Sequence, residues 1–435
     1  MNQTSLENLE RQIKKNIYGK PQKAKLFYPP GFGETALQEL KTILAHLWFP
    51  QNNKNDCVLN TKYIELTETH ISVLTEILLR AKCLSDIHLV LTEEKCKGKE
   101  EFKKICNSIK WNYYLNNNIN VKIKVNSIAS KAFHETGLKE IAHPIILPFI
   151  QGISTGEHSN EDTVINFELY KDKLTVSMSL VGQPLYKRGY KKELKTLAPL
   201  REDLAACCIQ KYFNDLKKNN ITLFPDKIYV PFAGSGTFAF ESHFYFENIA
   251  SHYFHREFII KKLPFFKKEN YNYLLKKSAE ENTKSIKQNN YETYCIDTSE
   301  SAVKNCKENN EKYLSYAKSI SDIELNLEIN NKDFFKNNTF ITKNEFKFLF
   351  IPLNPPYGLR ITNKQNTEVF YKRIAQTLNH LKEQIDTKNS HIGGFILCPS
   401  EETWSIFYNT LSFNVKDTYH FTQGGLDIRV CQFFI

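Results

Sequence analysis

The stretch IYVPFAGSGTFAFE, residues 228–241, decides the fold of this chain. Residues 228–232 predict a short buried strand, residues 233–237 a glycine loop and residues 238–241 the start of a helix. This order is typical of the ligand-binding loop of doubly wound α/β sheets, where glycines let the backbone approach a ligand and the helix start supplies unpaired N–H groups. The loop matches neither G-x-x-x-x-G-K-[ST] nor a full G-x-G-x-x-G, which disfavours nucleoside triphosphates and dinucleotides.

Two later strands are predicted to end in carboxylates. Residues 292–297 predict a strand that ends at Asp297, where such folds hold a ribose diol. Residues 330–334 predict the end of a third strand, with Asp333 placed to accept from an adenine amine. Each Asp alone is also typical of a helix N-cap or a turn. Because strand ends converge at the carboxyl edge of such a sheet, the ordered set predicts one ligand site there.

The turn LNPPYG, residues 353–358, has the parts needed to hold an exocyclic amine. The lone pair of such an amine is delocalised into its ring, so the amine is a poor nucleophile until that lone pair is drawn out. The Asn354 side-chain carbonyl and the Pro355 main-chain carbonyl could each accept one N–H, while the prolines stiffen the turn. Tyr357 offers a flat face for a splayed-out base. The alternative is an ordinary Pro-Pro loop that leaves a buried strand.

With these motifs the chain resembles the THUMP-domain RNA guanine-N2 methyltransferases, most closely the bacterial enzymes that modify 23S ribosomal RNA. The resemblance runs over most of the chain. The motifs that carry it are, in order, Pro30-Gly31-Phe32-Gly33-Glu34, Ile109-Lys110-Trp111, residues 185–190, residues 198–202, the glycine loop, the 249–258 insertion, Asp297 with Asn309, Asp333, the Asn-Pro-Pro-Tyr-Gly turn and Gly424-Gly425-Leu426-Asp427. It implies an α/β chain in which a Rossmann-like class I methyltransferase domain follows an α+β ferredoxin-like plus THUMP RNA-binding region.

The resemblance also implies the donor and the site. S-adenosyl-L-methionine would be the methyl donor, and RNA would be the partner, with ribosomal RNA ahead of transfer RNA. The donor would be held by Phe232, Ala233, Gly234, Ser235, Gly236, Thr237, Asp297 and Asp333, and the target base by Asn354, Pro355, Pro356 and Tyr357. The methyl group would pass in line to guanine N2 with no covalent enzyme intermediate and no metal, so most of the catalysis would be positioning.

Several positions depart from the family pattern. Val230 stands where the family has an acidic residue, Cys295 where it usually has glycine, and Ser299 where it has a second acidic residue. In the RNA-binding region, residues 142–146 (Ala-His-Pro-Ile-Ile) replace a Lys-Asp-Ala-Ile-like stretch. The missing carboxylate at Val230 predicts weaker donor binding, or another group in the donor site that compensates.

Two alternatives stay open. The amine-holding turn would serve adenine N6 of DNA or RNA equally well, although the THUMP-like half favours RNA. A catalytically decayed RNA-binding or ribosome-assembly protein is the second alternative, which Val230 supports. The intact residues 354–357 argue against it, because an inactive site has no use for a stiff base-holding turn.

Charge and composition fit a polyanionic partner. The 435 residues include 58 Lys and Arg against 48 Asp and Glu, which gives a net charge of +10 and a pI near 8.9. A general Lys and Asn bias explains part of this excess. RNA contacts are predicted at Lys187, Arg188, Tyr190, Lys191 and Lys192, where cations and stacking faces alternate, although a solvated linker would have a similar composition. A second candidate cluster spans residues 261–268.

The remaining patterns bound the compartment and the domains. Ten cysteines without a C-x-x-C pair predict reduced thiols and no zinc site, and no apolar run is long enough for a membrane span, so cytoplasm is expected. Helical spacing is predicted from Leu37 to Leu47 and over residues 71–84. The predicted division is a polar N-terminal extension (1–23), a ferredoxin-like domain (24–90), a THUMP RNA-binding domain (91–182), a basic linker (183–200) and a Rossmann-like methyltransferase domain (201–435).

Overall fold

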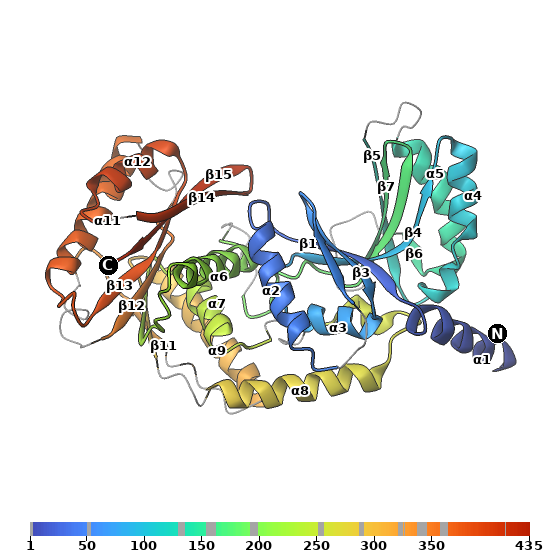
Figure 1. The fold of residues 1–435 in the computed structure, drawn as a ribbon, viewed down its shortest axis with the longest axis horizontal. Coiled ribbons are helices and arrows are strands. Elements are labelled where there is room, and N and C mark those ends of the chain that lie inside the picture. The colour runs from blue at the N-terminus through green and yellow to red at the C-terminus, as the bar shows by residue number, and fades with distance from the viewer. Residues whose placement is uncertain are drawn as a thin grey trace. The chain divides into compact units, whose positions relative to one another are not determined.

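The computed structural model describes residues 3–49, 54–128, 135–153, 162–191, 199–250, 256–286, 291–320, 325, 327–336, 346–356, 364–413 and 415–435 (Figure 1). The chain divides into two compact units. The N-terminal unit comprises Met1–Tyr28, Ala36–Lys187 and His255–Lys277, and the C-terminal unit comprises Pro29–Thr35, Arg188–Phe254 and Ser278–Ile435.

The N-terminal unit is built on an eight-stranded sheet with the order β2-β3-β1-β4-β8-β7-β5-β6. Its elements are α1 (Gln3–Ile13), a π-helical turn (Lys14–Tyr18), β1 (Gln22–Phe27), α2 (Gly33–Ala45), β2 (Asp56–Leu59), β3 (Tyr63–Thr69), α3 (Ile71–Arg80), β4 (Asp86–Lys95), α4 (Lys99–Ser108), β5 (Asn120–Ile128), α5 (Glu135–Ile146), β6 (Gly152–Ile153), β7 (Asp162–Tyr170) and β8 (Lys173–Ser179). The helices predicted from Leu37 to Leu47 and over residues 71–84 are therefore present as α2 and α3, which end at Ala45 and Arg80.

Strand β4 corrects the domain boundary predicted between residues 90 and 91. Its first half pairs antiparallel with β1, and it also pairs along its length with β8. Leu26, Leu89 and Met178 are fully buried in neighbouring strands. One hydrogen-bonded sheet and its apolar residues therefore join the segments that the sequence predicted as two domains.

The C-terminal unit is built on a seven-stranded sheet with the order β11-β10-β9-β12-β13-β15-β14. The first five of these strands are parallel, whereas β15 runs antiparallel to both β13 and β14. Its elements are α6 (Glu202–Lys218), β9 (Lys227–Pro231), α7 (Thr237–Phe246), β10 (Glu292–Asp297), α9 (Glu300–Ile320), β11 (Leu327–Asn331), β12 (Phe348–Leu353), α11 (Lys364–Glu383), β13 (His391–Cys398), α12 (Glu401–Thr410), β14 (Val415–Gln423) and β15 (Leu426–Phe434). This arrangement confirms the predicted α/β class and the alternation of strands and helices.

Helices cover both faces of this sheet, as the unbroken apolar sequence of β12 requires. On one face the Tyr212 ring of α6 stacks on Phe350 with centroids 5.4 Å apart. On the other face Tyr371 and Ile374 of α11 share a buried cluster with Leu349. Helices α11 and α12 lie side by side (Figure 1). The sheet is thus held rigidly from both sides, which fixes the loops at its carboxyl edge.

The segment His255–Lys277 follows α7 in the chain but folds with the N-terminal unit, which corrects the single 201–435 domain. It carries a 3-10 turn (Ile259–Lys262), and α8 (Lys268–Ile286) begins within it. Ile259 and Ile260 donate backbone hydrogen bonds to the carbonyls of Val181 and Leu180 (3.3 and 3.2 Å). Phe265 is 2% exposed. Apolar burial and backbone pairing therefore attach this insertion to the N-terminal unit.

None of the helices in the described part of the chain is both long and apolar enough to cross a bilayer.

Candidate active site

The four motif-bearing strands end at the same edge of the C-terminal sheet. In space their order is β11, β10, β9 and β12, and all four are parallel. The chain moves outward from β9 to β10 and β11 and then returns to the other side of β9 as β12. The order therefore reverses between β9 and β12, and such switch points are where open α/β sheets bind ligands. The glycine loop follows β9 and Asn354 follows β12, so the two motifs flank the switch point.

The glycine loop adopts a conformation that most residues resist. Phe232, Gly234 and Gly236 all have positive φ (58°, 55° and 83°). For an aromatic residue such as Phe232 this backbone is strained, and strain of this kind gathers at functional sites. A Cβ added to Gly234 would meet no atom within 4 Å, whereas one added to Gly236 would lie 2.7 Å from Cys306 Sγ. Gly234 therefore faces open space, and Gly236 permits close packing of the loop.

Two side chains hold this loop from the neighbouring elements. The Asp297 carboxylate accepts hydrogen bonds from the Gly234 N–H (2.9 Å) and from the Ser299 N–H (2.9 Å). Asn309 of α9, which is 2% exposed, donates its side-chain N–H to the Ser235 carbonyl at 3.0 Å. The backbone N–H of Ala233 also donates to the Ile296 carbonyl (3.0 Å). The loop is thus fixed before any ligand arrives.

Asp333 lies two residues beyond the end of β11 at Asn331, whereas the sequence predicted that the strand would end over residues 330–334. Its carboxylate accepts from the Phe335 N–H at 2.9 Å, and Lys336 lies 3.9 Å away. The end of β11 is tied to β10, because the Asn331 side chain donates to the Asp297 carbonyl at 3.0 Å. The predicted donor-side carboxylates therefore occupy adjacent loops at one edge.

An aromatic cluster that the sequence analysis did not identify lies beside these loops. The Phe232 ring contacts Phe334, Phe335 and Phe370, with centroids 5.4, 6.2 and 5.5 Å away. The Arg373 guanidinium lies 4.2 Å from the centroid of the Phe335 ring. Phe232, Phe335 and Phe370 are half-buried. Such a cluster offers flat apolar surface to a planar ligand. No sequence signal joins these rings, because they come from three separate segments.

The amine-holding turn is described in part. Asn354 follows the last residue of β12 and is half-buried, Pro355 is buried and Pro356 is half-buried. Tyr357 and Gly358 lie outside the described residues.

The linker residues predicted to contact RNA are corrected at two positions. Arg188 and Tyr190 are fully buried. The Arg188 guanidinium bonds the Glu241 carboxylate of α7 (3.4 and 3.3 Å), and Tyr190 donates to the same carboxylate at 3.1 Å. Burial raises the pKa of the Glu241 carboxyl, which the Arg188 charge opposes. These two side chains anchor the linker to α7 and are not accessible to RNA.

The other linker cations differ in their surroundings. Lys191 is mostly buried, donating to the Leu200 carbonyl (2.8 Å) and pairing with Glu202 (3.4 Å). Lys187 is exposed, and Lys192 lies outside the described residues. Lys187 therefore remains the one described RNA-contact prediction in this segment with an accessible side chain.

The departures from the family pattern lie together. Val230 of β9 and Cys295 of β10 are paired residues in adjacent parallel strands, and both are buried. All ten cysteines are free thiols, and every one except Cys57 is buried. Within the described ranges, no three His, Cys, Asp or Glu side chains gather as a metal site would require.

Comparisons with known proteins agree with this geometry. Residues 188–391 match the family described as "RMKL-like, methyltransferase domain". YpsC of Bacillus subtilis, named as a candidate RNA methyltransferase, is 25% identical over 264 residues, which are 60% of this chain and 56% of YpsC. The ribosomal RNA large subunit methyltransferase K/L of Acinetobacter baumannii is 30% identical over 60% of this chain and 32% of its own length. The matched parts thus span about half and a third of these relatives.

Solved structures resemble the fold over nearly the whole chain. SMU.472, a candidate methyltransferase solved with SAH, aligns with a TM-score of 0.66 at 20% identity, covering 95% of this chain and 98% of SMU.472. At this identity the likeness shows the fold alone. The sheet order, the glycine loop at the switch point and the likeness to solved methyltransferase structures show a Rossmann-like methyltransferase fold, in which residues 188–391 are similar to the RMKL-like methyltransferase domain.

Proposed function

We propose that the protein transfers the methyl group of S-adenosylmethionine to the exocyclic N2 amine of a guanosine in RNA, with 23S ribosomal RNA as the first candidate. The observation that carries this proposal is the position of the Asn354-Pro355 turn, which follows β12 directly across the switch point from the glycine loop. An amine held by the turn would face a methyl group held by the loop. The RMKL-like family match over residues 188–391 supports the same chemistry.

The residues present fit the donor. Gly234 leaves open space where a side chain would otherwise project, as close approach of a methionine tail requires. Each Asp297 oxygen accepts one backbone hydrogen bond and has a second lone pair for a ribose hydroxyl. The half-buried ring of Phe335 beside Asp333 would border the adenine. Val230 provides no carboxylate, so the donor's amino group would depend on backbone carbonyls and water.

The chain's own residues would act by orienting the target amine toward the methyl donor. The Asn354 side-chain oxygen and the Pro355 carbonyl would accept the two N–H groups of the amine and turn its lone pair toward the methyl group. The donor supplies an electrophilic methyl group on a sulfonium, and the C–S bonding pair remains on sulfur as the N–C bond forms. The methylated amine is acidic and loses its proton to water, so no side chain has to act as a base.

RNA as the substrate rests on the relatives and on charge. The named relatives are an RNA methyltransferase candidate and a ribosomal RNA methyltransferase. The chain's net charge of +10 favours a polyanion by counterion release. The eight-stranded N-terminal unit would be the RNA-binding region, in which we assign the segment after β4 to a THUMP module.

The test is a methylation assay with methyl-labelled S-adenosylmethionine and RNA from a strain that lacks the protein. The RNA is digested and the labelled nucleoside is identified by mass spectrometry. We expect N2-methylguanosine from the wild type and at least a hundredfold less from Asn354→Ala, since removal of one positioning or electrostatic contact in a transition state costs about that much. Asn379→Ala is the control, because Asn379 hydrogen-bonds the Thr410 carbonyl within the helical layer.

The other outcomes separate the alternatives. Labelled N6-methyladenosine would show that the target base is adenine and not guanine. No label in any RNA, including assembled ribosomal subunits, together with no binding of S-adenosylhomocysteine by calorimetry, would contradict the enzyme proposal and favour a non-catalytic RNA-binding protein.

A further inference from the structure

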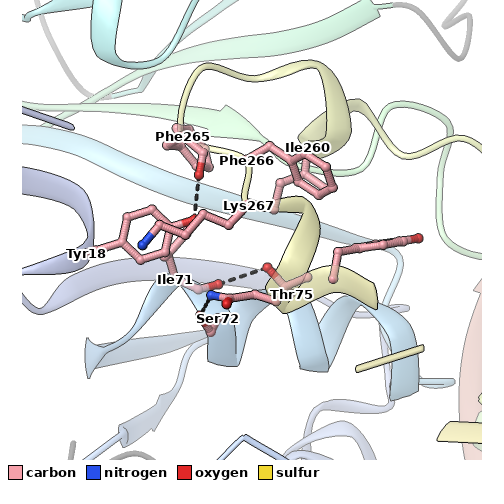
Figure 2. A pocket seen from close by; sticks show the side chains of 10 residues that line it. Tyr18, Ile71, Ser72, Thr75, Ile260, Phe265, Phe266 and Lys267 are labelled. Carbon is pink, nitrogen blue, oxygen red and sulfur yellow. Dashed lines mark hydrogen bonds between the residues drawn. The ribbon is translucent and has the colours of Figure 1, made fainter. Parts of the chain in front are cut away.

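A second cluster of cations and aromatic rings lies in the N-terminal unit. Its members are Lys14 and Tyr18 of the π-helical turn, His70 at the start of α3, and Lys267 of the 255–277 insertion. No role was predicted for residues 1–23, and the insertion, whose residues 261–268 were a candidate RNA-contact cluster, lies far from them along the chain. The fold brings both together around Tyr18 (Figure 2).

The Tyr18 ring is fixed in place. Its hydroxyl donates to the Phe265 carbonyl at 2.5 Å, and its edge contacts His70 with centroids 5.6 Å apart. The Lys267 ammonium lies 3.6 Å from the centroid of this ring. Figure 2 shows the Lys267 side chain beside Tyr18. The ring therefore positions one cation by a cation–π contact without neutralising its charge.

The positive charge of this cluster is largely uncompensated. Among the residues that the structure describes, neither Lys14 nor Lys267 forms an ion pair with a carboxylate. Burial and the Lys14 charge lower the pKa of Lys267, against a weaker opposing effect of Glu269. Lys14 is exposed and Lys267 is half-exposed, so a ligand can reach both. By contrast, Lys23 in the same unit is compensated, because it lies within 3.0 Å of both Glu65 and Glu93.

The backbone at this place is also unusual. Residues 14–18 form a π-helical turn, in which Gly19 donates to the Lys14 carbonyl at 2.9 Å, five residues earlier. Such turns are rare and are frequent at functional sites. Like charges held together without a partner lower the stability of the free protein, so the arrangement is explained best by an anion that binds there.

We propose that Lys14, Tyr18 and Lys267 form a docking site for the RNA backbone, at which the two ammonium groups contact phosphates of the substrate outside its methylated nucleotide. The choice of RNA as the partner rests on the proposed function, whereas the geometry of the site does not depend on it. Phosphate contacts of this kind position a nucleic acid without reading its sequence. The site would therefore raise affinity for RNA of any sequence and leave the chemical step unchanged.

The test measures binding of the full-length protein to a fluorescein-labelled RNA hairpin with a single-stranded tail, by anisotropy over a series of salt concentrations. We expect Lys267→Glu and Lys14→Glu each to weaken binding several-fold. Each should also reduce the slope of log K against log[salt] by about 0.7 to 0.9, the value for one lost phosphate contact. Lys267→Arg should retain binding. Lys276→Glu is the matched control, because Lys276 is an exposed lysine of α8 and its substitution changes the net charge equally.

The methylation assay separates this proposal from the proposed function. If the chain methylates RNA, Lys267→Glu should raise KM for RNA and leave kcat and the affinity for S-adenosylhomocysteine unchanged. If the protein does not methylate RNA but binds it in a way that depends on Lys14 and Lys267, the proposed function is contradicted and the docking site is supported. Equal loss in Lys267→Glu and Lys276→Glu, no loss in either, or no RNA binding by the wild type would overturn the docking site. If the substitutions weaken binding of an acidic protein and leave RNA binding unchanged, the assignment of RNA as the partner is overturned.

Discussion

At the scale of single residues, Asp297 binds the chain's own backbone as well as being the predicted ribose contact. Its two oxygens accept the N–H groups of Gly234 and Ser299, so the same carboxylate shapes the glycine loop. A residue with both roles affects donor binding even if its contact with the ribose is weak. The glycine loop and the end of β10 are therefore held together by these hydrogen bonds.

We expect Asp297→Ala to weaken the binding of S-adenosylhomocysteine about tenfold, or about 1.4 kcal/mol, because two backbone donors lose their acceptor. Asp297→Asn should lose less, since its carbonyl oxygen still accepts from Gly234. Isothermal titration calorimetry measures both. Asp386→Ala is the control: Asp386 also accepts from a backbone N–H two residues later, at Lys388 (3.1 Å), but in the turn before β13. Equal affinity in Asp297→Ala and wild type would contradict this role.

Sequence patterns predicted individual site residues better than their partners. The strand ends with Asp297 and Asn354 were predicted because an apolar run followed by a polar residue is a local signal. The contact of Asn309 with the Ser235 carbonyl was not, because 74 residues separate them. Arg188 and Tyr190 were predicted as RNA contacts from their composition alone. Their burial depends on Glu241, a partner that no local pattern reveals.

At the scale of secondary-structure elements, the Arg188–Glu241 ion pair joins the linker to α7, the helix that follows the glycine loop. Both side chains are completely buried. Removing one partner of such a pair leaves a buried charge uncompensated, whereas replacing both by apolar groups removes the charge altogether. The pair therefore specifies where the linker meets the domain more than it adds net stability.

We expect Arg188→Met and Glu241→Leu each to lower the free energy of unfolding by about 3–5 kcal/mol, and the double variant to lose clearly less than their sum. Urea denaturation followed by circular dichroism gives the three values. Lys218→Met is the control, because Lys218 is 69% exposed in its pair with Asp215 and should cost at most about 1 kcal/mol. Additive losses in the double variant would show that the two groups are not coupled. The RNA affinity of these variants should fall only as far as the folded fraction falls, because the buried Arg188 charge does not contact RNA.

Element prediction succeeded where the signal was an apolar run and failed where pairing crossed long distances. Strand β10 has the predicted bounds, Glu292–Asp297, and β9 differs from the predicted residues 228–232 by one residue at each end. Helix α5 continues through Pro144, a residue type that ordinarily ends or kinks a helix. Strand β4 was placed at a domain boundary, because its two partners, β1 and β8, lie on opposite sides of it in sequence.

At the scale of the whole molecule, chain order and spatial grouping diverge. The insertion 255–277 belongs to the N-terminal unit although the sequence on both sides of it belongs to the C-terminal unit. Local composition predicted RNA contacts at residues 261–268 of this segment, but its apolar residues decide where it folds. Ile259, Leu263 and Phe265 are at most 3% exposed. No single-sequence pattern indicates which of two sheets such residues will cover.

This grouping predicts how fragments behave. A fragment of residues 1–187 lacks the insertion, so the carbonyls of Leu180 and Val181 lose their hydrogen bonds and the Asn116 side chain loses the Lys262 carbonyl that it contacts at 2.6 Å. Without Ile259, Ile260 and Phe265 the fragment also loses the stabilising free energy of their burial, about 1.5–3 kcal/mol for each side chain. We therefore expect the fragment to unfold at a lower temperature than the N-terminal unit of the full chain and to bind a hydrophobic dye.

A synthetic peptide of residues 256–277, added in excess, should raise the fragment's melting temperature and suppress dye binding, because it binds the folded fragment in preference to the unfolded one. A peptide with Phe265→Asp and Ile260→Asp is the control, since it keeps the length but cannot bury these side chains. Differential scanning fluorimetry and dye fluorescence measure both effects. A fragment that melts like the full chain's N-terminal unit without the peptide would show that the insertion rests on that unit without stabilising it.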